Sequence, residues 1–162
     1  MNITNSSIDP AVAATGQHPS RAVVAWLRLV RVFQKVDHIS AETMRCRKLS
    51  MAQFDVLSQV GSNEGLTQQE LATSLLVTKG NVCQLLDRME ASGLLERRQE
   101  GRSNRLYLTT CGRTLFESAV PAQNDTIDRL FSSLSEEEQR DLTHILRKLD
   151  QSLTMPGDSC RE

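Results

Sequence analysis

The sequence lacks most of the features that mark a membrane protein, a secreted protein or an enzyme. Aromatic residues make up only 4% of its 162 residues, with one Trp and one Tyr. No apolar run approaches the ~18 residues of a membrane-spanning helix, and residues 1–19 lack the basic start and apolar stretch of a secretory leader. No phosphate-binding loop, nucleophile elbow or paired-carboxylate motif occurs. We therefore predict that the chain neither enters a membrane nor acts as an enzyme.

The cysteines and histidines show no spacing typical of disulfides or metal ligands. The four cysteines form no CxxC pair, which suits a reducing cytoplasm. The three histidines are too far apart for an HxxxH motif, and no Cys joins them in the sequence. We therefore predict a cytoplasmic protein with no metal site and no cofactor. The residues in question are Cys46, Cys83, Cys111, Cys160, His18, His38 and His144.

The formal net charge of −1 hides an uneven distribution of charge along the chain. Residues 1–66 carry seven Lys and Arg against five Asp and Glu, and residues 67–113 carry the same numbers. Residues 114–162 carry five against ten. The acidic excess therefore lies in the C-terminal third. A modestly basic middle region can still bind DNA, because neutralisation of phosphates is a local effect.

The middle region, residues 66–109, has the pattern of two short helices, a tight turn between them and two strands. Thr67 and Glu70 have the spacing of a capping box that opens the first helix. Thr78 is placed to cap the second helix, whose buried face is predicted to consist of Val82, Leu85, Leu86 and Met89. The two strands enclose a polar tip that contains glycine and form a wing. This pattern predicts a winged helix-turn-helix, which lays its second helix in the major groove of DNA.

The flanking segments are predicted to be helical, which makes the fold mainly α. A long helix spans about 20–46, and a second begins at Ser50 with Gln53 as its capping-box partner. After the wing, Thr109 or Thr110 caps a helix in which Pro121 either introduces a kink or begins a new segment. Ser135 and Glu138 open the last helix. We divide the chain into a loose arm (1–19), an N-terminal dimerisation helix (20–49), the winged-helix region (50–113), C-terminal dimerisation helices (114–155) and a tail (156–162).

Dimerisation is predicted from the apolar stripes of the flanking helices. Leu142, Ile145, Leu146 and Leu149 form one such stripe on the last helix. The winged-helix region is too small to cover every stripe, so a second copy of the chain is the expected partner. A two-fold dimer also presents two recognition helices to the two halves of a palindromic DNA site.

The same residues resemble the MarR family of bacterial regulators (multiple-antibiotic-resistance type). The resemblance lies in LTQQELA (66–72), VTKGNV (77–82), LLDRMEASGLLERR (85–98) and GRSNRLYLT (101–109). It extends over most of residues 20–153. Members of this family usually carry Asp-x-Arg-Ser or Asp-x-Arg-Asp in the wing, where this chain has Glu100-Gly101-Arg102-Ser103. The resemblance implies a dimeric repressor that releases its operator when a small, often aromatic or phenolic ligand binds.

The start of the second helix is the predicted reading surface. Its free backbone N–H groups and positive dipole attract a phosphate, to which Lys79 adds a charge. Gly80 permits a close approach to the DNA backbone. Gln84 can bond an adenine edge, and Arg88 can reach guanine or phosphate. The alternative is that Arg88, Asp87 and Glu90 only form surface ion pairs. The predicted contacts on this helix are Thr78, Lys79, Gly80, Asn81, Gln84 and Arg88.

The wing is predicted to contact DNA through its arginines. Arg102 at the tip suits the minor groove, whose negative potential favours Arg, and the resemblance implies the same role. Arg97, Arg98 and Arg105 are predicted to hold phosphates, or in the case of Arg98 to brace Glu100. Ser103 follows Arg102 in the motif and is included. A winged helix that binds a protein instead would have an acidic or uncharged reading surface, which this chain does not have.

Two ways of ending DNA binding remain open from the sequence. In the first, a ligand pocket is lined by Trp26, Phe33, Met44, Phe54 and Leu57, although plain core is the simpler interpretation of each residue. In the second, thiol oxidation is the switch. Cys83 lies on the recognition helix, and Cys111 lies in the first turn of a helix, where the dipole favours a thiolate. The simpler interpretation of each cysteine is a small buried apolar residue.

Overall fold

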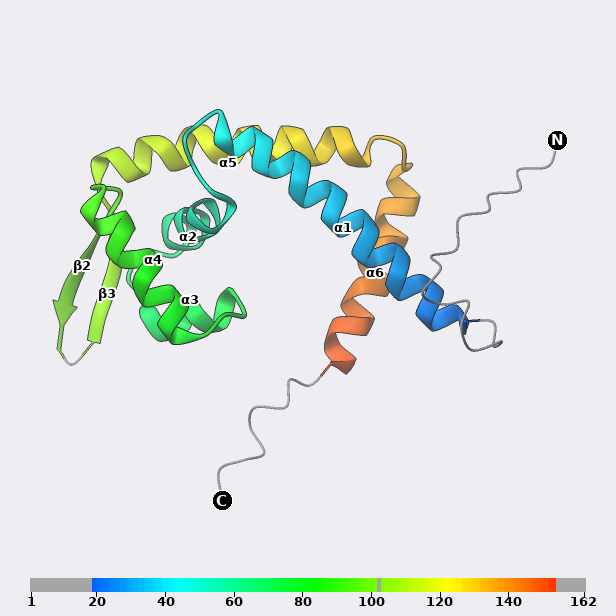
Figure 1. Cartoon of the computed structure of the whole chain (residues 1–162), viewed down its shortest axis with the longest axis horizontal. Helices are drawn as coiled ribbons and strands as arrows, with labels where there is room; N and C mark the ends of the chain where they lie inside the picture. The colour runs from blue at the N-terminus through cyan, green and yellow to red at the C-terminus, as the bar shows by residue number, and fades with distance from the viewer. Residues whose placement is uncertain (1–18, 102, 154–162) are drawn as a thin grey trace, which may run out of the picture. The chain divides into compact units, whose positions relative to one another are not determined.

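The structure is a computed structural model that describes residues 19–101 and 103–153. Within these residues the chain forms six helices and three strands. Figure 1 shows the helices and the two longer strands, β2 and β3. The predicted tail at 156–162 lies outside the described residues, as does the predicted arm at 1–19 except for Pro19. The elements are α1 (Arg21–Arg45), α2 (Met51–Ser62), β1 (Leu66–Thr67), α3 (Gln68–Ser74), α4 (Lys79–Ala91), β2 (Leu95–Glu100), β3 (Ser103–Leu108), α5 (Thr110–Phe131) and α6 (Glu136–Ser152).

The chain divides into two compact units, residues 1–39 and 40–162, and the boundary falls inside α1. The first unit, as far as it is described, is the helical segment up to Ile39. The second unit contains the winged helix together with α5 and α6. The five-part division expected from the sequence remains a prediction.

Side-chain caps fix where most helices of the second unit begin. Complete capping boxes open α2 at Ser50, α3 at Thr67 and α6 at Ser135, which confirms all three predictions. The Thr109 hydroxyl accepts a hydrogen bond from the Gly112 N–H and opens α5. The two acidic partners in these boxes, Glu70 and Glu138, have a pKa below the ordinary value of 4.5, because the backbone N–H and then the hydroxyl of the capping residue hydrogen-bond to the carboxylate.

The sheet has three antiparallel strands in the order β1-β3-β2. Strands β2 and β3 form the predicted wing, with Leu95 opposite Leu108 and Glu100 opposite Ser103. Strand β1 was not predicted; its Leu66 pairs with Leu106 of β3. The wing is therefore hydrogen-bonded to the residues that lead directly into α3.

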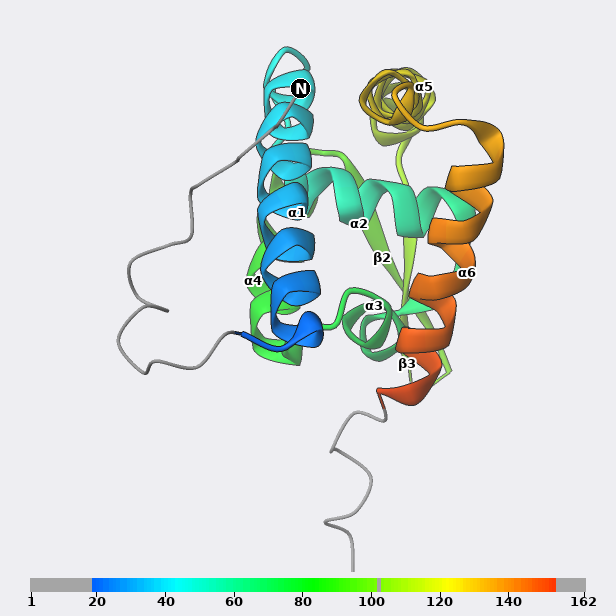
Figure 2. The ribbon, with the colours of Figure 1, turned by 90° about the vertical axis from the view of Figure 1, so that its right-hand side faces the viewer.

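The core of the second unit is built around α2, which contacts α3, α4, α5 and β3 (Figure 2). Val56, Leu57 and Val60 of α2 are fully buried. Buried residues from the other elements complete the cluster, and they include Met44, Leu71, Val82, Leu86, Met89, Leu95, Leu106 and Ala119. The predicted buried face of α4 is confirmed for Val82, Leu86 and Met89, while Leu85 is half-buried.

Helix α5 packs closely on the base of the wing because Gly112 has no side chain. A β-carbon at this position would overlap the Leu94 carbonyl oxygen. The Thr109 hydroxyl donates a hydrogen bond to the Gly93 carbonyl oxygen at 2.6 Å and fixes the same junction. Helix α5 then runs through Pro121 without interruption, so Pro121 does not begin a new segment.

The outer helices carry apolar side chains that the described chain leaves exposed. On α6 no residue is buried. Ile145 and Leu149 of this helix are exposed, and so is Leu153, which follows its last residue. In the first unit Trp26 is 61% exposed and Phe33 is 66% exposed. None of the described helices is both long enough and apolar enough to cross a membrane.

Candidate nucleic-acid interface

Helix α4 presents one polar face to solvent and the opposite face to the core. Gly80, Gln84 and Arg88 are exposed, as expected of the face opposite the buried one, and Asn81 is exposed as well. The Arg88 Nε donates a hydrogen bond to the Gln84 carbonyl oxygen at 3.2 Å, which holds Arg88 along the helix surface. Lys79 is the first residue of α4, but its side chain is outside the described set. The exposed groups are amides and a guanidinium, which are the groups that bond base edges.

The N-terminus of α4 differs from the capped helices because its backbone N–H groups receive no side-chain cap. Thr78 occupies the N-cap position with φ −71° and ψ 147°, but its hydroxyl makes no cap hydrogen bond. The prediction that Thr78 caps α4 is therefore right in position and wrong in the hydrogen bond. The residues before it, Leu76 and Val77, are exposed, and Leu76 has the left-handed φ of 53°. The first-turn N–H groups of α4 are available to an external acceptor such as a phosphate.

Arg97 of β2 connects the base of the wing to α4. Its Nη1 donates to Glu90 Oε2 at 2.5 Å, and its Nη2 donates to Asp87 Oδ1 at 2.6 Å. Its backbone N–H also donates to Glu90 Oε1 at 3.1 Å. Burial by itself would lower the pKa of Arg97, but the two carboxylates outweigh it and hold the pKa above its ordinary value. The ion pairs of Asp87 and Glu90 therefore run to Arg97, not to Arg88.

Glu100, the carboxylate of the wing motif, is held by β3. It accepts a hydrogen bond from the Tyr107 hydroxyl at 2.8 Å, and its Oε2 lies 3.1 Å from Arg105 Nε. The hydrogen bond to Glu100 raises the pKa of Tyr107, which favours the protonated donor. The prediction that Arg98 braces Glu100 is wrong, because Arg105 takes that place. Arg105 also donates from Nη1 to the Gly65 carbonyl oxygen at 2.6 Å.

Arg98 lies on the exposed side of the wing. It pairs with Glu96 of the same strand, Nε to Oε1 at 2.8 Å, and its guanidinium carbon lies 4.4 Å from the centre of the Tyr107 ring. The hydrogen bond to Glu96 is the largest cause that raises the pKa of Arg98. Ser103 is exposed, and Arg102 lies outside the described residues. The wing thus carries exposed Arg98 and Ser103 and half-buried Arg105 on the strands that flank its tip.

The sequence offered ion pairs of Asp87 and Glu90 as one alternative but missed their partner, Arg97. Asp87 and Glu90 are three residues apart, which places them on the same side of a helix, and Arg97 follows seven residues after Glu90. That spacing indicates a pair of carboxylates that a following strand can reach. It does not show that the strand turns back against the helix, so the sequence alone places Arg97 with the phosphate contacts.

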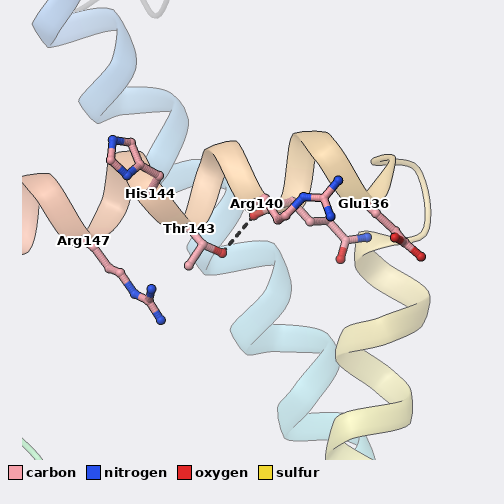
Figure 3. A pocket seen from close by; sticks show the side chains of 6 residues that line it. Glu136, Arg140, Thr143, His144 and Arg147 are labelled. Carbon is pink, nitrogen blue, oxygen red and sulfur yellow. Dashed lines mark hydrogen bonds between the residues drawn. The ribbon is translucent and has the colours of Figure 1, made fainter.

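The five residues predicted to line a ligand pocket are divided between the two units, and the pocket stays a prediction. Met44, Phe54 and Leu57 are buried core residues of the second unit, whereas Trp26 and Phe33 belong to the first unit. One hollow of about 540 Å³ lies on α6 alone (Figure 3). Another of about 670 Å³ lies between the end of α1 and α5 and includes Thr43, Arg47 and Thr126. Neither hollow is lined by any of the five predicted residues.

The described cysteines differ in their surroundings. Cys46 and Cys111 are exposed, so the simple interpretation of Cys111 as buried is wrong. Cys83 is half-buried, and its Sγ lies 3.6 Å from Gln68 Oε1 of α3. Cys160 lies outside the described residues. In the part of the chain that the structure describes, no three His, Cys, Asp or Glu side chains cluster as metal ligands would.

Comparison with known proteins identifies the family. The sequence profile of the MarR family matches residues 48–105. An uncharacterized HTH-type transcriptional regulator of Bacillus cereus is 36% identical over 125 residues, covering 76% of this chain and 85% of that protein. The chain belongs to the MarR family. It is therefore a DNA-binding transcriptional regulator, as the helix-turn-helix pattern predicted, and its relatives are regulators and not enzymes.

Other transcriptional regulators resemble the chain over most of its length. The HTH-type transcriptional repressor MdtR of Bacillus subtilis is 30% identical, covering 78% of this chain and 83% of MdtR. A cysteine-to-serine mutant of Escherichia coli MarR complexed with operator DNA has a TM-score of 0.73 and 27% identity, covering 82% of this chain and 99% of that one. The Mycobacterium tuberculosis MarR family protein Rv2887, in complex with salicylic acid, has a TM-score of 0.63 and 26% identity, covering 83% and 98%. These likenesses support the predicted mainly α winged-helix fold.

Proposed function

We propose that this chain is a sequence-specific repressor that binds a palindromic operator as a homodimer. The observation that carries the proposal is the exposed face of α4, where Gln84 and Arg88 project from a helix whose other face is fixed in the core. A recognition helix must be held rigidly at this orientation if its side chains are to read base edges. The protein acts in the cytoplasm, where it reaches the chromosome.

Base reading and phosphate binding are assigned to different residues. Gln84 bonds an adenine edge and Arg88 a guanine edge, while Arg102 enters the minor groove next to the site. Phosphates are held at the uncapped start of α4 and along the wing, where contacts set the register and carry no sequence information. The phosphate-binding residues are Thr78, Lys79, Gly80, Asn81, Arg98, Ser103 and Arg105.

The homodimer is supported by the exposed apolar side chains of the outer helices. The exposed side chains of Ile145 and Leu149 on α6 and of Leu153 just after it recur every four residues, so they line one side of the helix. Trp26 and Phe33 on α1 are a second set. Exposed groups of this kind are covered by a partner in stable assemblies, and a second copy supplies matching groups through two-fold symmetry.

Release by a small aromatic or phenolic ligand is the proposed switch. The name of MdtR supports repression, and the salicylic acid complex of Rv2887 supports the class of ligand. Such a ligand must bind a form with wrongly spaced recognition helices more tightly than the DNA-bound form, since only differential affinity shifts an equilibrium. Titration of the protein–operator complex with salicylate, and separately with benzoate, which lacks the phenolic hydroxyl, tests whether this class of ligand releases the DNA.

Selection of bound sequences from random DNA tests the proposed function directly. We expect enrichment of a palindrome with half-sites about one helical turn apart. Arg102→Ala should then weaken binding to that palindrome by about 1–3 kcal/mol, and Lys79→Ala should weaken palindrome and random DNA alike. Recovery of unrelated sequences without a shared palindrome would contradict sequence-specific repression.

Thiol oxidation is the second candidate switch, and the contact of Cys83 with Gln68 favours it. An oxidised sulfur at this point would disturb the packing of α3 on α4 and add charge near phosphates. Cys83→Ser keeps a similar size and polarity. Peroxide that weakens operator binding by the parent but not by Cys83→Ser would support this switch over the ligand.

A further inference from the structure

The recognition helix carries two carboxylates close to the surface that is proposed to meet DNA. Asp87 lies three residues after Gln84 and immediately before Arg88, and its side chain is 66% exposed. Glu90 is 40% exposed, one turn further on. Phosphates repel carboxylates at this range, so two bare negative charges here would oppose binding to any DNA sequence.

Arg97 lies inside this pair, where it faces protein. Its side chain is only 17% exposed, and both terminal nitrogens are occupied by Glu90 and Asp87. Nη2 also lies 3.5 Å from the Cys83 carbonyl oxygen. Its Nε is buried and has no partner within the described residues. A guanidinium with this geometry offers little to a phosphate, because its N–H donors point into the protein.

Arg98 is the natural contrast on the same strand. Its side chain is 58% exposed, and it pairs with Glu96 of its own strand, not with α4. Neighbouring residues of a strand project to opposite faces, which explains why two consecutive arginines have different surroundings. One arginine faces the recognition helix and the other faces solvent.

We infer that Arg97 is a positioning residue that neutralises Asp87 and Glu90 and thereby allows α4 to approach the DNA phosphates. The inference rests on the proposed function. It corrects the expectation from the sequence that Arg97 itself holds a phosphate. The same bonds fix β2 against the C-terminal half of α4, so Arg97 also sets the position of the wing relative to the recognition helix.

A double-mutant cycle separates neutralisation from direct contact. Arg97→Gln is made in the parent and in a background with Asp87→Asn and Glu90→Gln, and affinity for random duplex and for the selected palindrome is measured by fluorescence anisotropy. Neutralisation predicts a loss of about tenfold in the parent and less than twofold in the amide background, because no carboxylates then remain to be neutralised. A direct phosphate contact predicts the same loss in both backgrounds.

Arg98→Gln serves as the matched control, because its loss of affinity should be equal in the two backgrounds. Circular dichroism melts report whether each variant folds. If Arg97→Gln does not fold, Arg97→Lys replaces it; a lysine keeps the charge, so its affinity should stay within threefold of the parent, and a tenfold loss would overturn the inference. An equal Arg97→Gln loss in both backgrounds would overturn it while leaving the proposed function intact. A parent that bound no duplex DNA would overturn both.

Discussion

The winged helix and the outer helices solve the burial of apolar side chains in opposite ways. In the winged helix, apolar residues of α2, α3, α4 and β3 cover one another, and Val56, Leu57 and Leu106 are fully buried. On α6 no residue is buried, and Ile145 remains 61% exposed. The winged helix completes its core within one chain, whereas the outer helices leave apolar side chains exposed, which a second copy is proposed to cover. Folding of the DNA-binding part and assembly of the dimer should therefore be separable by substitution.

Gly112→Ala should give the largest effect, a loss of stability confined to the winged helix. Its β-carbon would overlap the Leu94 carbonyl oxygen, which is backbone and cannot rotate away. We expect a loss of about 3 kcal/mol in the free energy of unfolding, measured by urea denaturation.

Gly80→Ala is the matched control, because it is the same change in another helix with no atom near the new methyl group. It should raise the free energy of unfolding by about 0.5–1 kcal/mol. At the same time it should weaken DNA binding, since the methyl group faces the proposed phosphate contact. If both alanine variants were equally stable, the close packing of α5 on the wing would not be essential.

Two added negative charges on α6 should disrupt the proposed dimer interface and leave the winged helix folded. Ile145→Glu with Leu149→Glu places carboxylates where apolar side chains are proposed to meet, so the dimer should weaken about a hundredfold in sedimentation equilibrium. The winged helix should keep its secondary structure by circular dichroism. Thr143→Glu, on the polar face of α6, should remain dimeric. An unchanged dimer in the double variant would place the interface elsewhere.

Leu76→Asn should stabilise the winged helix by less than the two preceding changes destabilise their targets. Leu76 is 76% exposed and has a φ of 53°, a conformation that costs a leucine about 1 kcal/mol and that Asn tolerates better. The midpoint of urea unfolding should rise accordingly. Leu76→Ala removes the exposed side chain but keeps the backbone strain, so it should show no comparable gain.

Lowering the pH should have the smallest effect on stability, and it should act on both the winged helix and α6. The carboxylates of Glu70 in α3 and Glu138 in α6 have lowered pKa values, so their stabilisation is complete above about pH 4.5 and is lost as the pH falls through the folded-state pKa. Glu70→Gln keeps the capping acceptor without the charge. Its unfolding temperature should therefore change less than that of the parent between pH 5 and pH 3; an equal change would exclude Glu70 as a contributor.

The parts of the fold that the sequence predicted depend on short-range interactions. The Ser50–Gln53, Thr67–Glu70 and Ser135–Glu138 capping boxes each span three residues, and the structure has all of them. The buried stripe of α4 was predicted for the same reason, because it repeats within a single helix. Local spacing is sufficient where both partners lie on one turn.

The parts that the sequence missed depend on distant pairing. Strand β1 has two residues and no periodicity, and it exists because Leu66 meets Leu106 across the sheet. The Arg97 ion pairs require β2 to turn back along α4, and the bracing of Glu100 by Arg105 requires the register of the hairpin. Thr78 has the residue type and position of a cap, but its side chain does not make the bond.

The edges of the wing have a mechanical consequence. Strand β3 is joined to β1 at the entrance of α3, and β2 is joined to α4 by Arg97. Both edges of the hairpin are therefore tied to the helix-turn-helix. Wing and recognition helix should therefore move as one rigid body, and a ligand of the proposed kind would change the position of that body without changing its internal geometry. If the proposed ligand acts in this way, distances between spin labels within one winged helix should stay constant when it binds, while distances between the two winged helices of the proposed dimer change.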